Sequence, residues 1–295
     1  MVRHALVQLK PVKGDVLATI DRIAAMLADL QDEQVDIVTF PETALSGYFL
    51  QGGVREQALS AAEVFEALRG ALNDAGWHRP VDLCLGAFER AQDDLFNSAF
   101  YLEFNTENEG VRHVHRKMFL PTYGVFDEGR FVSPGNELEA FDTRFGRAGM
   151  LVCEDAWHSS TAAVLALKGA DILYTPTATP ARDLRGKVPA NARRWHSTAE
   201  GIGAEHGLFV VTTSLVGFEG GKGFSGYSSI VDPFGETIAL GSLLEEEVLL
   251  ADIHLESIAV ARYETPLLSD LRANLGNLIT GFQQAQGAQG AKVRP

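Results

Sequence analysis

The stretch VDIVTFPET (residues 35–43) gives the strongest indication of the fold. Its apolar residues stand at consecutive positions instead of alternating with polar ones, as expected for a strand that is covered on both faces. A second stretch, ADILYTPTA (170–178), repeats the order of Asp-Ile, an apolar strand and a proline. This short internal repeat supports a single duplicated domain.

Further strands and helices extend outward from these two stretches. After Asp15, apolar residues recur at helical spacing, and helical segments are also expected around 60–75 and within 180–206. Short apolar strands are expected at 4–9, 81–89, 96–104, 111–119, 147–153, 208–217, 227–233, 236–240 and 247–253. Strands outnumber helices, yet helices occur in both halves, which favours two packed sheets with helices outside. The sequence therefore predicts an α/β fold, a four-layer αββα sandwich.

The chain shows no obvious boundary between domains. No stretch rich in proline, serine and glycine divides it, so we expect one domain over residues 1–280. Residues 281–295, GFQQAQGAQGAKVRP, have the low-complexity composition of a loose C-terminal tail.

The composition excludes several classes of protein. With 46% hydrophobic and 22% charged residues among 295, and no apolar run near the ~18 residues of a membrane span, we expect a soluble globular protein. The net charge of -14 repels nucleic acid and anionic membranes, so neither is expected as a partner. The two cysteines cannot build a disulfide framework, from which we infer a cytoplasmic location.

Three segments place a reactive side chain at the end of a strand or in the loop that follows. They are FPET with Glu42, HRKMFLP with Lys117, and LVCED with Cys153. Open α/β sheets place their sites at such positions. Each residue also has an ordinary interpretation: a structural ion pair for the glutamate, a solvated strand face for the lysine, and core packing for the cysteine. Core packing alone is expected for Cys84, which has leucine on both sides.

Taken together and in this order, the three residues resemble the nitrilase superfamily of carbon–nitrogen hydrolases. The segments FDEGRFVSPG (126–135) and GYSSIVDPFGE (226–236) extend the resemblance over nearly the whole chain. Within the superfamily, KMFLPTYGVFDEGRF (117–131) and CEDAW (153–157) are most similar to the glutaminase domain of glutamine-dependent NAD synthetases. The SGG-type phosphate loop of their synthetase domain does not occur in these 295 residues, so we expect a free-standing hydrolase.

The resemblance implies an amidase that needs no metal and no cofactor. Cys153 would attack the amide carbon, with Glu42 as general base and Lys117 stabilising the negative oxygen of the intermediate. Glu128 matches a fourth acidic residue of the family that positions the lysine or the attacking water. True nitrilases usually carry tryptophan directly after the cysteine, where this chain has Glu154, so amides are expected over nitriles.

Four residues are expected to contact the substrate. The ring of Tyr123 could wall the pocket, and the backbone N–H of Glu154 could be a second donor to the oxyanion. Arg182 or Arg185, in the basic segment 177–195, could bind a substrate carboxylate such as that of glutamine. The alternative for each arginine is a solvated helix face. The resemblance further implies a homodimer, formed through the helix after the cysteine.

Other interpretations of the same residues stay open. In a Cys–His hydrolase or transferase, His158 or His115 would be the base in place of the glutamate. An N-carbamoyl hydrolase or a nitrilase of the same family would use the same four residues. A non-catalytic member would bind an amide-bearing metabolite or a partner protein. GGKG (220–223) lacks the spacing of a phosphate loop and is expected to be a lid or turn, and no G-x-S-x-G elbow occurs.

Overall fold

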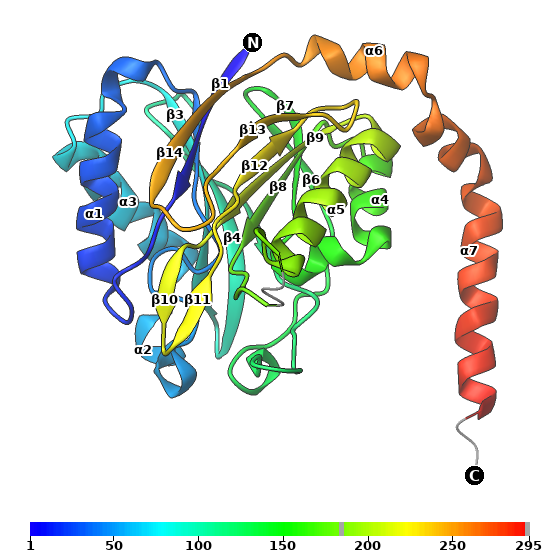
Figure 1. Ribbon diagram of the computed structural model, residues 1–295, viewed down its shortest axis with the longest axis horizontal. Helices are drawn as coiled ribbons and strands as arrows, with labels where there is room; N and C mark the ends of the chain where they lie inside the picture. The colour runs from blue at the N-terminus through cyan, green and yellow to red at the C-terminus, as the bar shows by residue number, and fades with distance from the viewer. Residues whose placement is uncertain (183–185, 293–295) are drawn as a thin grey trace.

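The computed structural model describes residues 1–182 and 186–292 and confirms the four-layer αββα sandwich (Figure 1). The first sheet has the order β14 (Glu247–Ile253), β1 (Val2–Gln8), β2 (Ile37–Thr39), β3 (Val81–Ala91), β4 (Asp94–Phe104) and β5 (Gly110–Arg116). The second has the order β13 (Thr237–Leu240), β12 (Ser229–Val231), β9 (Phe209–Ser214), β8 (Ile172–Thr177), β7 (Gly146–Met150) and β6 (Ala140–Thr143).

Helices cover the outer faces of the two sheets (Figure 1). On the first sheet lie α1 (Val16–Asp29) and α3 (Ala61–Asp74), with the short α2 (Val54–Gln57) at one end, and on the second lie α4 (Ser159–Leu167) and α5 (Ala190–His206). The predicted start of α1 is confirmed, because the Asp15 carboxylate accepts the Ala18 N–H at 3.0 Å. The predicted apolar face of α1 is buried as well.

The two repeated stretches, residues 35–43 and 170–178, occupy equivalent places in the two sheets. β2 lies between two parallel neighbours, β1 and β3, and β8 lies between two parallel neighbours, β9 and β7. Every residue of both strands is buried, since each sheet packs against the other sheet on one face and against helices on the opposite face. The carboxyl ends of these central strands therefore open onto the same region of the sandwich.

Two short elements were not expected from the sequence. The strand β6 pairs with β7, and residues around the GGKG segment form a hairpin of β10 (Gly217–Glu219) and β11 (Lys222–Phe224). Gly220 and Gly221 make its turn with φ of +56° and +77°, values that glycine adopts without strain. The segment is thus a tight hairpin, and Figure 1 shows it projecting at one end of the sandwich.

The C-terminal segment is helical where its composition indicates a loose tail. After α6 (Glu256–Glu264), the helix α7 (Leu267–Lys292) begins against the core through Leu268 and Leu271 and then leaves the body of the protein (Figure 1). No helix in the described part of the chain combines the length and apolar character needed to cross a membrane.

Candidate active site

Four of the predicted residues meet at one end of the sandwich. Glu42 follows β2, Lys117 follows β5, Glu128 opens the 3₁₀ turn η3 (Glu128–Arg130), and Cys153 opens the 3₁₀ turn η4 (Cys153–Trp157) after β7. The Lys117 Nζ lies 2.8 Å from Glu42 Oε1 and 2.6 Å from Glu128 Oε1. Both carboxylates and the lysine also act electrostatically on the Cys153 sulfur. Segments far apart in the sequence thus converge on one sulfur atom.

The position of Glu42 depends on a close approach of the backbone to β3. The carbonyl of Pro41 accepts the N–H of Gly86 at 2.9 Å, and the Ala44 N–H donates to the Gly86 carbonyl at 2.8 Å. A Cβ atom at position 86 would stand 2.5 Å from the Cα of Glu42. Glycine at this position therefore lets the turn after β2 fold against β3, and this turn carries the carboxylate into the cluster.

Two buried polar residues complete the cluster and were missed from the sequence. Asn97, on β4, donates to Glu42 at 2.7 Å and to Glu128 at 3.5 Å. The hydroxyl of Tyr48 donates to Glu128, and the ring of Tyr48 lies 5.8 Å from the Lys117 ammonium. A signal existed for the asparagine, because it is a polar residue in the predicted strand 96–104 and a buried polar side chain needs a hydrogen-bond partner.

A carboxylate beside the cysteine joins the two segments that carry the cysteine and the lysine. Asp155 is fully buried, and one of its oxygens accepts the N–H groups of Met118 and Phe119 at 3.0 and 2.9 Å. The other oxygen accepts the Val152 N–H at 3.1 Å and lies 2.8 Å from the ring Nε2 of His115. The sequence indicated an acidic turn here but not this role. Asp155 is thus a positioning residue for the cluster.

The charges of the cluster set the protonation of its members. Burial by itself would lower the pKa of Lys117, but Glu128 and Glu42 outweigh burial and hold that pKa well above its ordinary value. Burial raises the pKa of Glu42, which Lys117 partly opposes and Glu128 reinforces. Burial and the charge of Glu42 also raise the pKa of Cys153 well above its ordinary value, although Lys117 opposes them. The thiol therefore keeps its proton until a base removes it, so the lysine alone does not make a resting thiolate.

Cys153 faces a narrow cleft. The residue is 8% exposed, and its φ of +48° is unusual for a residue other than glycine, so the turn holds Cys153 in a strained conformation. The free space over it is about 20 Å³, which is room for one water molecule. Tyr123, Glu154 and Arg182, which the sequence analysis expects to contact the substrate, line this cleft.

The lining of the cleft carries groups of both signs of charge. The Tyr123 hydroxyl donates to the Glu154 carboxylate at 3.0 Å, and the Arg182 guanidinium stands 5.3 Å from the centre of the Phe126 ring. Trp157 Nε1 and Thr179 Oγ1 also line the cleft and have no hydrogen-bond partner among the residues that the structure describes. Arg185, predicted as a second carboxylate contact, lies outside the described residues.

The two histidines considered as alternative bases have other partners. The ring of His115 bonds Asp155, and the ring of His158 stacks on Phe119 with 3.7 Å between ring centres. Within residues 1–182 and 186–292, no hydrogen bond joins either ring to the cysteine. In the same residues, no group of three or more His, Cys, Asp or Glu side chains is arranged to hold a metal ion. Glu42, by contrast, is among the charged groups that act on the Cys153 sulfur, and neither histidine is.

Comparisons with known proteins converge on one family. A family model described as carbon–nitrogen hydrolase matches residues 3–263. A glutamine-dependent NAD(+) synthetase from Thermotoga maritima is 28% identical over 86% of this chain, which spans only 42% of that relative's length. A nitrilase from Pyrococcus abyssi is 28% identical over 86% of this chain and 90% of its own. The crystal structure of a carbon–nitrogen hydrolase from Helicobacter pylori G27 superposes with a TM-score of 0.81, at 28% identity over 95% of this chain and 98% of that one.

Proposed function

The chain belongs to the carbon–nitrogen hydrolase family, and from that premise we propose that it hydrolyses the C–N bond of a small linear amide through a thioester on Cys153. The observation that carries the proposal is the buried cluster in which Lys117 contacts Glu42 and Glu128 at 2.8 and 2.6 Å beside the cysteine. A buried lysine between two carboxylates next to a thiol supplies a base, a fixed cation and a nucleophile in one place.

Acylation uses the proton that the thiol keeps at rest. As the sulfur attacks the amide carbon, Glu42 takes the thiol proton, so no free thiolate has to accumulate. The Lys117 ammonium, with the backbone N–H of Glu154, stabilises the negative oxygen of the tetrahedral intermediate. Glu42 then gives its proton to the leaving nitrogen. Ammonia departs, and the acyl group stays on Cys153 as a thioester.

Deacylation repeats the proton transfers with water. Glu42 takes a proton from the attacking water, whose oxygen bonds to the thioester carbon, and the sulfur leaves and recovers that proton. Asn97 and Lys117 hold the Glu42 oxygen Oε1 at 2.7 and 2.8 Å, while Oε2 has no partner among the described residues. The oxygen Oε2 is therefore the one that we assign to proton transfer. The product is a carboxylic acid, and the thiol is restored.

The groups that line the cleft suit an amide that carries charge at its other end. The Arg182 guanidinium can take a carboxylate, with the N–H of Trp157 and the hydroxyl of Thr179 as further donors. The Glu154 carboxylate and the Tyr123 hydroxyl can take an ammonium. An amino-acid side-chain amide such as glutamine presents both groups. Because the resting cleft has room for only one water molecule, its walls must move apart to admit such a substrate.

Arg182→Ala is expected to raise the KM for glutamine by about tenfold or more, since a charge-assisted contact to the substrate carboxylate is lost. The KM for butyramide, which has no carboxylate, is expected to change by less than about twofold. Arg193→Ala, in the same basic segment but exposed on α5, is the matched control and should alter neither constant. If Arg182→Ala raised the KM for glutamine and the KM for butyramide by the same factor, the result would contradict a carboxylate contact and indicate a packing role for Arg182.

The function is tested by intact-mass detection of an acyl adduct together with ammonia release. The panel contains glutamine, aliphatic amides, N-carbamoyl compounds and nitriles, and we expect an amide to leave its acyl group on Cys153. If a carbamoyl compound or a nitrile is turned over preferentially, that compound replaces the amide as the proposed substrate, and the thioester mechanism is retained. If the whole panel gives neither turnover nor adduct, the chain is instead a non-catalytic binding member.

The base is identified by pH–rate profiles of two variants. Glu42→Gln should lose activity at every pH, whereas His158→Ala should keep the profile of the parent protein, because His158 stacks on Phe119 instead of facing the sulfur. The reverse result, in which His158→Ala loses activity and Glu42→Gln keeps it, would favour a Cys–His hydrolase.

A further inference from the structure

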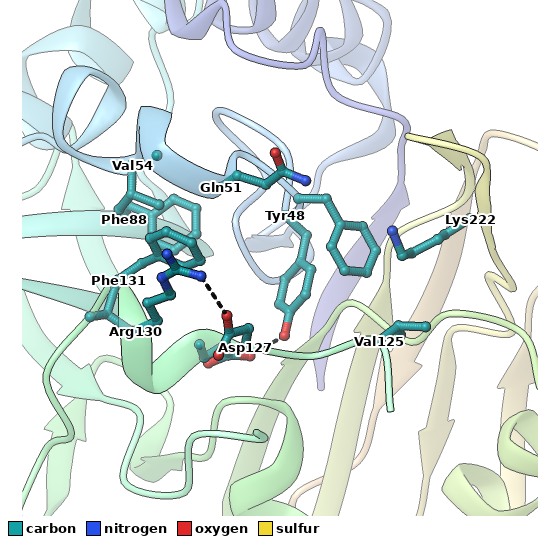
Figure 2. Close-up of a pocket in the computed structure, with 13 residues that line it drawn as sticks. Tyr48, Gln51, Val54, Phe88, Val125, Asp127, Arg130, Phe131 and Lys222 are labelled. Atoms are coloured by element: carbon teal, nitrogen blue, oxygen red, sulfur yellow. Dashed lines mark hydrogen bonds and ion pairs between the residues drawn. The ribbon is translucent and has the colours of Figure 1, made fainter. Parts of the chain in front are cut away.

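A second and larger cavity touches the catalytic cluster from another side. It has a volume of about 520 Å³ and lies among the segment after Tyr48, strand β3, the loop at 125–132 and the β10–β11 hairpin (Figure 2). Tyr48 and Glu128 line it, but Cys153 does not, because the cysteine opens onto the narrow cleft described above. Its size falls within the usual range for small-molecule sites.

The walls of this cavity are mainly aromatic and aliphatic. Phe88, Phe131 and Val54 come from one small hydrophobic cluster beneath the loops, and Phe49 and Tyr48 come from another. In Figure 2, Phe88 and Phe131 lie on one side of the space and Tyr48 on the other. Such walls suit a ligand with a flat apolar body.

Two of the acidic residues in the lining already have cationic partners. Glu128 is bound to Lys117 and receives the Tyr48 hydroxyl, and Asp127 lies 3.7 Å from the Arg130 guanidinium. Each carboxylate of the lining therefore already lies near a cation of the protein, so neither calls for a cationic ligand.

A lysine adds positive charge at the mouth. The Lys222 ammonium stands 4.4 Å from the centre of the Phe49 ring. The hairpin that carries it is held in place by Glu219, whose carboxylate accepts the N–H groups of Tyr48 and Phe49 at 2.9 and 3.0 Å. In a protein of net charge -14, an anion is held only where local cations outweigh the overall field.

We propose that this cavity is a second ligand site, for a small monocarboxylate with a flat apolar body. The apolar body lies between Phe49 and the Phe88–Phe131 side, and the carboxylate meets Lys222 at the mouth. Tyr48 and Phe126, whose ring centres are 6.1 Å apart, stand between this site and the Cys153 cleft. The ligand therefore binds beside the catalytic cluster without reaching the sulfur.

The site is tested by titrating 3-phenylpropanoate with the full chain and measuring its binding by ligand-observed NMR. We expect saturable binding with a Kd of about 5 mM or tighter, and binding of the uncharged 3-phenylpropan-1-ol that is about tenfold weaker. Lys222→Glu should weaken binding of the carboxylate by about tenfold or more, and Lys222→Arg should keep it. Lys168→Glu, outside the lining at the end of α4, makes the same change of net charge and should have no effect.

Two further variants separate this site from the Cys153 cleft. Val125→Trp alters a half-exposed residue of the lining and should weaken binding by narrowing the cavity, without burying a new group in the core. Cys153→Ala should bind as tightly as the parent protein, so the readout does not depend on turnover. Absence of saturable binding, or a Kd unchanged in both Lys222→Glu and Val125→Trp, would overturn the proposal.

Discussion

Cys153→Ala is expected to lower kcat for every amide substrate by at least about 10⁴-fold, because no other group can form the thioester. The acyl adduct seen by intact mass should disappear in the same variant. Folding should be almost unaffected, since the side chain is small and the substitution removes only the sulfur. The measurement is ammonia release under saturating substrate, paired with thermal unfolding.

The second cysteine provides the matched control for this experiment. Cys84 is 1% exposed within β3, and its sulfur lies 3.7 Å from that of Met150, in the core between the sheets. Cys84→Ala should cost about 1 to 2 kcal/mol of unfolding free energy and change kcat by less than about twofold. A Cys153→Ala protein that kept its activity, or an adduct found on Cys84, would refute the proposed mechanism.

Lys117→Met is expected to damage both catalysis and stability. The substitution removes the cation that faces the oxyanion, which should lower kcat by at least about 10³-fold. It also leaves Glu42 and Glu128 buried side by side without the ammonium that they both contact, which should cost about 3 to 5 kcal/mol of unfolding free energy near neutral pH. Kinetics and denaturant unfolding of the same preparation measure the two effects.

The stability loss should depend on pH with a defined sign. Burial holds the pKa of Glu42 above its ordinary value of 4.5, and removal of Lys117 takes away the contact that opposes this rise. A carboxyl whose pKa is higher in the folded state favours folding below the unfolded pKa, and this contribution is lost as the pH rises through the folded pKa. The deficit of Lys117→Met should therefore be smallest near pH 4.5 and should grow toward alkaline pH.

An exposed lysine serves as the control for this series. Lys168 is about two-fifths exposed at the end of α4, where it pairs with Glu139, and Lys168→Met should cost less than about 1 kcal/mol at any pH. A Lys117→Met protein as stable as the parent at neutral pH would mean that the lysine does not neutralise the two carboxylates.

The candidate residues could be named from the sequence partly because two of them follow apolar strands that are easy to recognise, whereas the strand before Lys117 is mostly polar. Glu42 and Cys153 stand directly after buried strands, and their order along the chain with Lys117 matches a family pattern. The residues that contact this cluster and position it are not indicated by any comparable sequence pattern. Tyr48 lies in an irregular loop, and Asp155 reads as one more acidic residue of a turn.

The cavity beside the cluster was also beyond the reach of sequence reasoning. The GGKG segment does not have the spacing of a phosphate loop. Nothing in its sequence pattern indicated that Lys222 would lie over the ring of Phe49, which is far away in the chain. The predicted turn is present as the tip of a hairpin, which Glu219 ties to the segment at Tyr48 and Phe49. Such a contact depends on how two loops pack and not on the composition of either.

The sequence by itself determined the layers of this protein and the three residues at its candidate centre. The layers follow from local patterns, because consecutive apolar residues produce strands that must be covered on both faces, and the three residues follow from the family pattern that they match. Only the tertiary structure decided which buried polar groups meet, as with Lys117 and Glu42, which are 75 positions apart. It also decided that the thiol keeps its proton, since burial and neighbouring charges shift a pKa only after packing has brought them together.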